Sequence, residues 1–300
     1  MNTCLTFRWI SLSAAAILLM NSCSTITFVA QDDLYQPVSE MVNIDNTSTS
    51  DNGYKPAAKK NGWNLVWADE FNEAQLDTNK WNHEVNGDGG GNQELQYYVA
   101  SKNNSYTVAN KYLVIKAIKQ NYKGKMFTSA RLNTKKKADW TYGRFDIRAK
   151  TPVQQGVWPA IWMLPTDWVY GSWPQSGEID IMESIGHQPK TCYGTIHFGQ
   201  AWPNNKHIGD TIETKQGDLS TTFHVYSVEW EPTEIRWYFD DELYCTKKNT
   251  DVAPERWPFD QQFHVILNLA IGGQWPGPPD EGTNFPKYMF VDYVRVYQKI

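Results

Sequence analysis

Hydrophobic and polar residues alternate along most of the chain from residue 61 onward. The alternation has a period of two and is rich in β-branched and aromatic side chains, which is typical of half-buried β-strands. The runs with this pattern are 112–118, 142–149, 222–230, 234–239, 242–245, 263–271 and 288–297. Asp240 and Asp241 predict a tight turn between two of these runs. No segment longer than about 12 residues carries the apolar stripe of an amphipathic helix. We therefore expect an all-β fold, an antiparallel β-sandwich of jelly-roll type, with residues 61–300 as one domain.

The first 60 residues depart from this pattern. Arg8, an apolar run over 10–20 and Cys23 resemble a bacterial lipoprotein leader, in which the thiol of the cysteine is lipidated. The apolar run is shorter than the roughly 20 residues that a membrane-spanning helix needs. Residues 24–60 are rich in Asp, Asn, Ser, Thr and Lys without sustained periodicity, which predicts a flexible tether. We expect export signal 1–23 to give either a membrane-anchored lipoprotein or, after ordinary cleavage, a secreted protein.

The charge balance argues against a nucleic-acid partner. The chain has 28 basic and 33 acidic residues, and its longest basic block is 135–137. Fourteen Trp, sixteen Tyr and twelve Phe are too many for the interior alone, so exposed aromatic surface is expected. Outside the leader, Cys192 and Cys245 either pair in an exported protein or remain buried thiols. We expect a monomer.

Three carboxylates lie in the predicted strand 177–183. Glu178 and Asp180 share a face because side chains alternate along a strand. Glu183 has the opposite parity, and it joins them only if a β-bulge near 181–182 inserts one residue. Mutual repulsion then raises the pKa of at least one acid. Such a set is able to hydrolyse a glycosidic bond through a nucleophile and a proton donor. A bound cation such as calcium and a solvated strand are the alternatives, and the cation is the less favoured of the two.

Aromatic residues and long loops accompany the three acids. Trp158 and Trp162 share parity in a predicted strand, and flat rings of this kind suit the faces of sugar rings. Gly and Pro cluster at 87–91, 168–177 and 272–282, which predicts long loops at the rim of the sandwich. Such loops are where binding surfaces are usually built.

The segment Gly156–Leu164, followed by Gly177–Glu183, closely resembles the signature of glycoside hydrolase family 16, in particular its laminarinase-like β-1,3-glucanases. Further segments in the family's order are 67–71, 92–98, 143–145, 266–273 and 291–297. The resemblance therefore covers essentially all of 63–298. It implies a jelly-roll sandwich with an open cleft on its concave sheet, acting on internal bonds with retention of configuration. The family's Glu-x-Asp-x-x-Glu form contains the extra residue of the bulge.

Carried over by position, the resemblance implies a role for each acid. Glu178 is the expected nucleophile, Glu183 the acid/base, and Asp180 the group that positions the nucleophile. The substrate-binding candidates are Trp158, Trp162, His197, Arg131 and Trp275, of which His197 and Arg131 match family positions near the cleft. No cofactor is required for this chemistry.

The family often carries a structural calcium on the face away from the cleft. Glu70 and Asp292 match that region and are the expected metal-binding candidates.

The expected activity is endo-acting hydrolysis of a β-1,3-glucan such as laminarin. One departure concerns the substrate, because Gly90-Gly91-Asn92 stands where the laminarinase pattern usually has Trp-Gly-Asn. The same fold acting on mixed-linkage β-1,3-1,4-glucan or on a red-algal galactan is therefore an alternative. A carbohydrate-binding jelly roll without turnover is another, although a binding-only relative is expected to lose one of the acids, and this chain keeps all three.

Overall fold

The computed structural model describes residues 59–60 and 62–299 of the chain. The leader with Cys23 and nearly all of the expected tether lie outside the described residues, so the predictions made for them stay predictions. The first described strand, β1 (Lys59–Lys60), begins close to the expected domain boundary at residue 61. Within the described part, no helix is long and apolar enough to cross a membrane.

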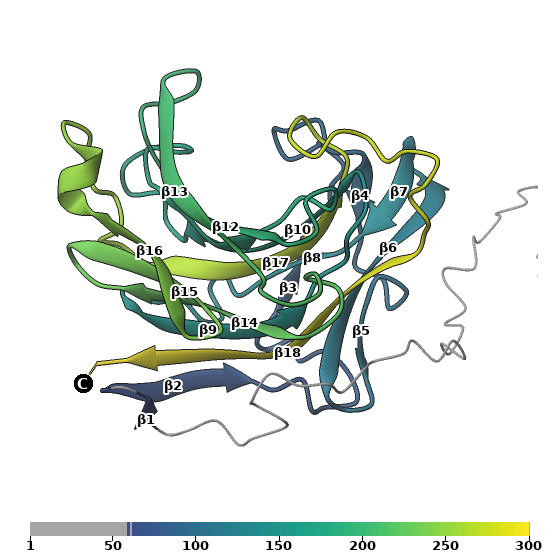
Figure 1. Ribbon diagram of the computed structural model, residues 1–300, viewed down its shortest axis with the longest axis horizontal. Coiled ribbons are helices and arrows are strands. Elements are labelled where there is room, and N and C mark those ends of the chain that lie inside the picture. Colours follow the sequence, from purple (N-terminus) through teal and green to yellow (C-terminus); the bar gives the residue numbers. More distant parts are fainter. Residues whose placement is uncertain (1–58, 61, 300) are drawn as a thin grey trace, which may run out of the picture. The chain divides into compact units, whose positions relative to one another are not determined.

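Two antiparallel-rich sheets pack face to face (Figure 1). We call the seven-stranded sheet the cleft sheet and the eleven-stranded sheet the back sheet. The cleft sheet has the order β13 (Asn205–Glu213), β12 (Thr191–Gly199), β11 (Glu178–Glu183), β10 (Val157–Pro165), β17 (Phe263–Ile271), β8 (Arg131–Asn133) and β3 (Asn82–His83). The cleft sheet is bent, and the side away from the back sheet lies on the inside of the bend (Figure 1).

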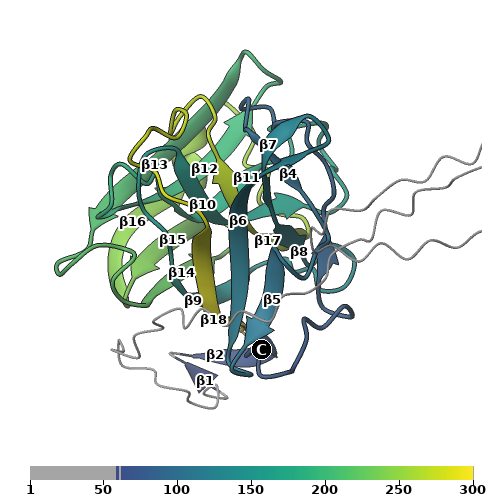
Figure 2. The same ribbon diagram turned by 90° about the vertical axis from the view of Figure 1, so that its right-hand side faces the viewer.

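The back sheet runs from β16 (Glu242–Lys248) through β15 (Glu234–Phe239), β14 (His224–Trp230), β9 (Gly143–Lys150), β18 (Lys287–Gln298), β6 (Tyr112–Tyr122) and β7 (Lys125–Ser129) to β4 (Gln96–Tyr98). Off this path, β1 and β2 (Trp63–Asp69) continue from β18, and β5 (Ser105–Val108) pairs with β6. Figure 2 shows β18, β6 and β5 side by side at the front of the turned view. Only the short β4–β7 pair is parallel among the described strand pairs, so the expected antiparallel sandwich is confirmed.

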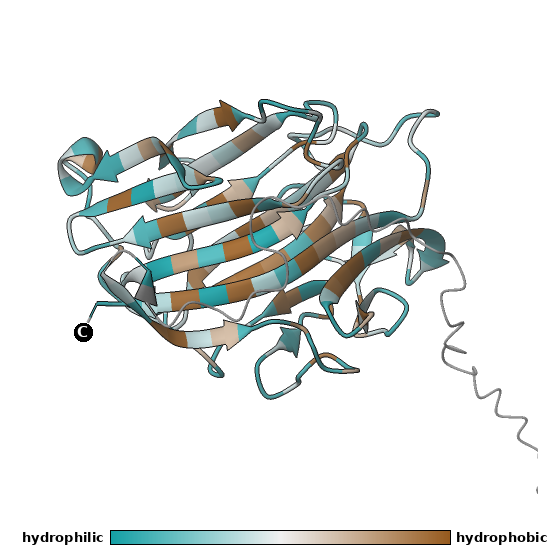
Figure 3. Cartoon of the chain, turned by 60° about the horizontal axis from the view of Figure 1, so that its bottom comes forward, coloured by the Kyte–Doolittle hydropathy of each residue, from teal (hydrophilic) through white to brown (hydrophobic). Residues whose placement is uncertain are grey.

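The alternating pattern decides which face of each strand enters the core. On β9, Phe145 and Ile147 are buried between the sheets, whereas Arg144 and Asp146 point to the other face and pair with each other at 2.7 Å. Figure 3 shows the same alternation of hydrophobic and hydrophilic residues along the back-sheet strands. Burying one large apolar side chain contributes about 1.5–3 kcal/mol. The summed burial on both inner faces therefore sets the register of the sandwich.

The strand predictions agree with the structure at several boundaries. The runs 234–239 and 263–271 coincide with β15 and β17, and the predicted turn between β15 and β16 is confirmed. Asp240 and Asp241 have φ of 50° and 64°, which a two-residue hairpin turn of type I′ requires. Cys192 and Cys245 are both free and buried, which confirms the alternative of two unpaired thiols.

Candidate active site

The strand β11 carries a β-bulge between Asp180 and Glu183. Asp180 pairs with Thr195 of β12, and Glu183 pairs with Tyr193. The step on β11 is therefore one residue longer than the step on β12, which is the definition of a bulge. The predicted bulge is confirmed.

The inserted residue changes the parity of the strand after Asp180. Ile181 and Met182 are consecutive, yet both are buried in the core between the sheets, at 1% and 0% exposure. In a regular strand one of the two would face the cleft. Because both enter the core, Glu183 returns to the cleft face that already carries Glu178.

Two tryptophan indoles hold the two glutamates. The Nε1–H group of Trp158, on the neighbouring strand β10, donates to Oε1 of Glu183 at 3.0 Å. The Nε1–H group of Trp173 donates to Oε2 of Glu178 at 2.8 Å. Trp173 lies in the Gly- and Pro-rich segment before β11, and its role was not predicted beyond its place in that loop. The loop composition was the only signal in the sequence that pointed to it.

Asp180 lies between the two glutamates and is almost completely buried, at 1% exposure. Its backbone oxygen accepts a hydrogen bond from Trp237 Nε1 of the back sheet at 2.7 Å. His197 is the cross-strand partner of Glu178, so the register of β12 places its ring beside the acids. His197 Nε2 lies 3.1 Å from Asp180 Oδ2 and 3.7 Å from Glu178 Oε1. The structure thus brings His197 to the acids, as expected.

The electrostatics of the site follow from burial and from like charges. Burial and the charge of Asp180 raise the pKa of Glu178 to about 8, while His197 and the Trp173 hydrogen bond act in the opposite direction. Burial and Asp180 also raise the pKa of Glu183 well above its ordinary value. Burial lowers the pKa of His197, but the nearby Glu178 and Asp180 outweigh it and raise that pKa to about 10. His197 is therefore an imidazolium at neutral pH.

Trp162 and Arg131 form a second polar and aromatic contact on the cleft face. Trp162 Nε1 donates to Asn268 Oδ1 at 2.6 Å, and the guanidinium of Arg131 lies 4.6 Å from the Trp162 ring centroid. Arg131 is also 3.0 Å from Glu84 Oε2. Arg131 thus supports Trp162 through a cation–π contact.

Trp275 extends the site beyond Glu183. Its ring packs edge-on against Trp158 at 5.5 Å and against Tyr193 at 4.9 Å, and it is 40% exposed. Tyr193 was not predicted, although it is the cross-strand partner of Glu183. These three rings form an aromatic surface on the Glu183 side of the acids.

Glu70 and Asp292, the expected calcium candidates, are each paired with an arginine. Arg295 donates to both carboxylate oxygens of Glu70 at 2.8 Å, and Arg148 donates to Asp292 at 2.5 Å. Calcium needs six to eight oxygen ligands, and these two carboxylates are already occupied by guanidinium groups. As arranged, the two side chains do not fit a calcium site.

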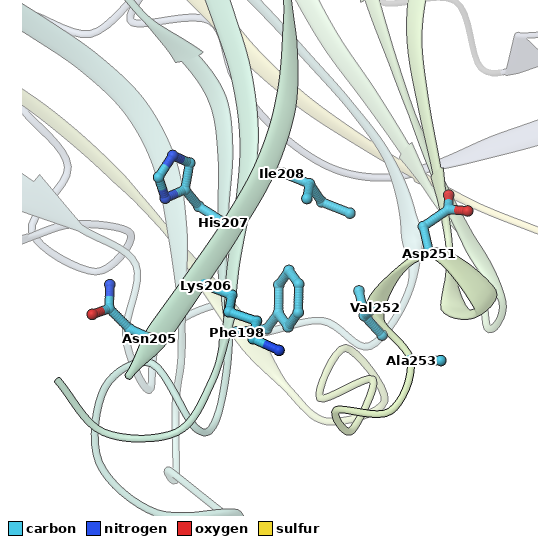
Figure 4. Close-up of a pocket in the computed structure, with 8 residues that line it drawn as sticks. All are labelled: Phe198, Asn205, Lys206, His207, Ile208, Asp251, Val252 and Ala253. Atoms are coloured by element: carbon cyan, nitrogen blue, oxygen red, sulfur yellow. The ribbon is translucent and has the colours of Figure 1, made fainter. Parts of the chain in front are cut away.

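One pocket of the structure lies away from the acids. It is formed between β12, β13 and the 3₁₀ turn Asn249–Val252, and Figure 4 shows the residues that line it. They are Phe198, Asn205, Lys206, His207, Ile208, Asp251, Val252 and Ala253. None of the three acids lines this pocket. The presence of a pocket therefore does not identify the position of the catalytic residues in this protein.

Replacing Trp173 with phenylalanine is expected to shift the pH profile. The change removes the hydrogen bond that favours ionised Glu178, so the pKa of Glu178 rises further. If turnover requires ionised Glu178, the acidic limb of kcat/KM moves to higher pH. At pH values below the limb, kcat/KM falls roughly tenfold for each unit of that movement.

The measurement is kcat/KM against pH for the Trp173→Phe variant and the unmodified chain. Trp257→Phe is the matched control, because the Trp257 ring packs against Phe259 rather than against a carboxylate. An acidic limb that stays in place in Trp173→Phe would contradict the assignment.

Comparison with known proteins places these features in a family. The family described as Glycosyl hydrolases family 16 matches residues 92–294. A β-glucanase of Rhodothermus marinus is 47% identical over 253 residues, which cover 79% of this chain and 85% of that protein. The solved structure of the Rhodothermus marinus laminarinase has a TM-score of 0.73 and 45% identity, over 79% of this chain and 98% of that one. The structure of a non-specific endo-β-1,3(4)-glucanase crystallised with a glucan oligosaccharide has a TM-score of 0.72 and 38% identity. The match covers 82% of this chain and 98% of that one.

Proposed function

The chain belongs to glycosyl hydrolase family 16, and from this premise we propose that it is a retaining endo-β-1,3-glucanase. The observation that carries the proposal is the bulge of β11, which sets Glu178, Asp180 and Glu183 on one face. Glycoside hydrolysis with retention needs a nucleophile and a proton donor that flank the same bond. The similarity to laminarinases and β-glucanases supports the β-1,3-glucan substrate.

In the proposed reaction, Glu178 attacks the anomeric carbon while Glu183 protonates the leaving glycosidic oxygen. A covalent glycosyl-enzyme intermediate forms, and Glu183 then deprotonates the water that hydrolyses it. The raised pKa of Glu183 suits a group that must carry a proton near neutrality. The Trp173 hydrogen bond and the positive charge of His197 favour the ionised form of Glu178. Asp180 lies beside the nucleophile, and its charge raises the pKa of both glutamates.

The aromatic surface supports binding of a chain rather than of a chain end. Trp158 and Trp275 lie on the Glu183 side, which is the side of the leaving group in this mechanism. Trp162, with Arg131 behind its ring, lies on the same face of β10 and pairs across to Asp180. Trp173 contacts Glu178 on the other side of the acids. Rings at both glutamates allow sugar units to bind on either side of the cleaved bond, which suits endo-acting cleavage.

The site residues determine the type of reaction more closely than they determine which glucan linkage is cleaved. Gln274 donates its backbone N–H to the carbonyl of Asn92 at 2.8 Å, so the loop with Gly90 and Gly91 contacts the loop with Trp275. The laminarinase pattern usually has a tryptophan at the position of Gly90. A tryptophan there would border the aromatic surface that contains Trp275. A wider rim there is compatible with mixed-linkage β-1,3-1,4-glucan, which is the second candidate substrate. The acidic balance of the chain disfavours a sulfated galactan.

A binding protein without turnover is the third candidate. It is disfavoured because all three acids are present and each glutamate is held by an indole N–H group.

Export, with anchorage through Cys23, is part of the same proposal and rests on the leader pattern of residues 1–23. Incorporation of a labelled fatty acid into the expressed protein would test the anchor.

The experiment that tests the function is a comparison of polymers. We expect reducing ends to appear fastest from laminarin, more slowly from mixed-linkage glucan, and not from agarose or carrageenan. Early products should be oligosaccharides of several lengths, because an open site cleaves internal bonds. Tight binding of laminarin without any product would support the binding protein instead. Faster cleavage of mixed-linkage glucan would reassign the substrate and leave the mechanism in place.

A further inference from the structure

A line of hydrogen-bonded side chains connects Trp162 to a buried carboxylate. The indole N–H group of Trp162 donates to Oδ1 of Asn268 at 2.6 Å. Asn268 Nδ2 in turn donates to the hydroxyl oxygen of Tyr98 at 3.1 Å, and that hydroxyl donates to Oε2 of Glu94 at 3.2 Å. Gln96 also donates to Oε2, at 2.6 Å. The line therefore ends at a carboxylate oxygen that accepts two hydrogen bonds.

The line leads away from the cleft surface. Trp162 is half-buried on β10. Asn268 on β17 is 5% exposed, Tyr98 on β4 is 2% exposed, and Glu94, just before β4, is 6% exposed. Gly90 lies over the carboxylate, since a Cβ atom at Gly90 would be 2.4 Å from Glu94 Oε1. Glu94 and Tyr98 are therefore placed to influence a bound sugar through Trp162 rather than by direct contact.

The chemistry of the donors and acceptors gives the line one direction. An indole N–H group only donates, an ionised carboxylate only accepts, and a tyrosine hydroxyl has a single proton to donate. Because Tyr98 gives that proton to Glu94, its oxygen accepts from the amide nitrogen of Asn268. The amide oxygen of Asn268 then faces the indole of Trp162. Without the carboxylate, the Tyr98 hydroxyl is free to donate to Asn268 instead, which turns the amide nitrogen towards the indole.

The surroundings of Glu94 support its role as the final acceptor. Burial raises the pKa of Glu94, whereas the hydrogen bonds from Gln96 and Tyr98 and the charge of Arg131 act in the opposite direction. The guanidinium of Arg131 also lies 4.6 Å from the ring centroid of Trp162. Trp162 is therefore held in two ways, by a cation–π contact on its ring and by the hydrogen-bonded line at its N–H group.

We propose that Glu94 and Tyr98 are positioning residues, which act through Asn268 to hold the indole of Trp162 at the angle at which its ring binds a sugar unit of the glucan. The sugar-binding part rests on the proposed function. Trp162 is the cross-strand partner of Asp180, so a ring that turns here changes the cleft wall next to the acids. Because Glu94 and Tyr98 do not touch the reacting atoms, their loss weakens substrate binding and leaves the chemical step in place.

The first test is the measurement of KM and kcat on laminarin for Tyr98→Phe and Glu94→Leu. Each variant removes one link of the line and keeps a side chain of similar size. We expect KM to rise about 2–10-fold, the usual worth of one hydrogen bond, while kcat changes by less than about twofold. Glu94→Gln should recover most of the loss, because its amide oxygen still accepts from Tyr98.

The same measurement in a Trp162→Phe background shows the route of the effect. Phenylalanine has no N–H group, so the line ends before it reaches the ring. Adding Glu94→Leu to Trp162→Phe should therefore raise KM no further. A full further rise in that background would overturn the proposal, because Glu94 would then act on the sugar by another route.

The indole signal of Trp162 provides a readout that needs no substrate. In the full chain with isotope-labelled tryptophan, each indole N–H group gives a signal in a proton–nitrogen NMR spectrum, and that of Trp162 is the one lost in Trp162→Phe. We expect this signal to shift in Tyr98→Phe and Glu94→Leu, and to return towards its original position in Glu94→Gln. An unchanged signal in the first two variants would overturn the proposal.

Tyr238→Phe is the matched control. The Tyr238 hydroxyl donates to Oε2 of Glu229 at 2.9 Å, so this variant also removes a tyrosine–glutamate hydrogen bond, but on the back sheet. Its KM and its Trp162 signal should stay unchanged, and a KM that rises as much as in Tyr98→Phe would contradict a specific role for Tyr98. Thermal unfolding checks that each variant is folded, and Tyr98→Phe decides the test by itself if Glu94→Leu does not fold.

The two proposals fail separately. The NMR signal reports the surroundings of the Trp162 indole whether or not any polymer is cleaved, so a shift in a protein that cleaves no glucan would refute only the glucanase. Cleavage of laminarin with an unmoved signal would refute only the positioning role. A shifted signal with unchanged KM would refute the part of the inference that concerns sugar binding.

Discussion

Replacing Glu178 with serine is expected to abolish the release of reducing ends from laminarin, with kcat falling by about 10⁴-fold or more. The serine hydroxyl is too short to reach the anomeric carbon from β11, and it lacks the carboxylate oxygen that makes the attack. The Nε1–H group of Trp173 also loses the oxygen that accepts its hydrogen bond. The measurement is the initial rate of reducing-end release at saturating laminarin.

Glu213→Ser is the control for the Glu178→Ser variant. Glu213 is exposed at the end of β13, and its replacement leaves the cleft face unchanged. Added azide should partly restore cleavage of an activated aryl β-glucoside oligosaccharide by Glu178→Ser. The product should be the α-glycosyl azide, because the small anion then attacks from the side that the carboxylate occupied. An undiminished rate on laminarin would refute Glu178 as the nucleophile.

Replacing Glu183 with alanine is expected to lower kcat on laminarin by about 10²–10⁴-fold, the usual contribution of general acid–base catalysis. A sugar leaving group needs a proton, and Glu183 is the carboxyl group held beside Trp158 for that purpose. An aryl glycoside with an acidic phenol needs no such proton, so its first step should be nearly unaffected. The alkaline limb of the pH profile should disappear as well, because activity is lost when Glu183 deprotonates as the pH rises through its raised pKa.

Azide distinguishes Glu183 from Glu178. In Glu183→Ala the covalent intermediate still forms on Glu178, and azide replaces water in its breakdown. The expected product is the β-glycosyl azide, opposite to that of Glu178→Ser. If the two variants gave the reverse pair of anomers, the roles of the two glutamates would have to be exchanged.

The β-bulge of β11 is a feature that the local sequence pattern predicted correctly. Ile181 and Met182 are adjacent apolar residues between two acids, and only a bulge lets both enter the core while Glu183 faces out. The prediction succeeded because the free energy of burying two apolar side chains outweighs one disrupted pair of strand residues. The edge strand β13 was not predicted, because little apolar burial marks its pattern. Its residues are exposed or half-buried, so they carry no clear alternation.

By itself, the sequence determined the strand-rich fold, the turn at Asp240, the parity of the three acids and the side of β10 that carries Trp158. These properties depend on residues close together in the chain, where side-chain direction follows from backbone geometry. Only the tertiary structure decided that Trp173 binds Glu178, that His197 stands at Asp180, and that arginines occupy Glu70 and Asp292. Those contacts depend on how strands and loops far apart in the chain are placed by packing of the whole sandwich, and no local pattern encodes that placement.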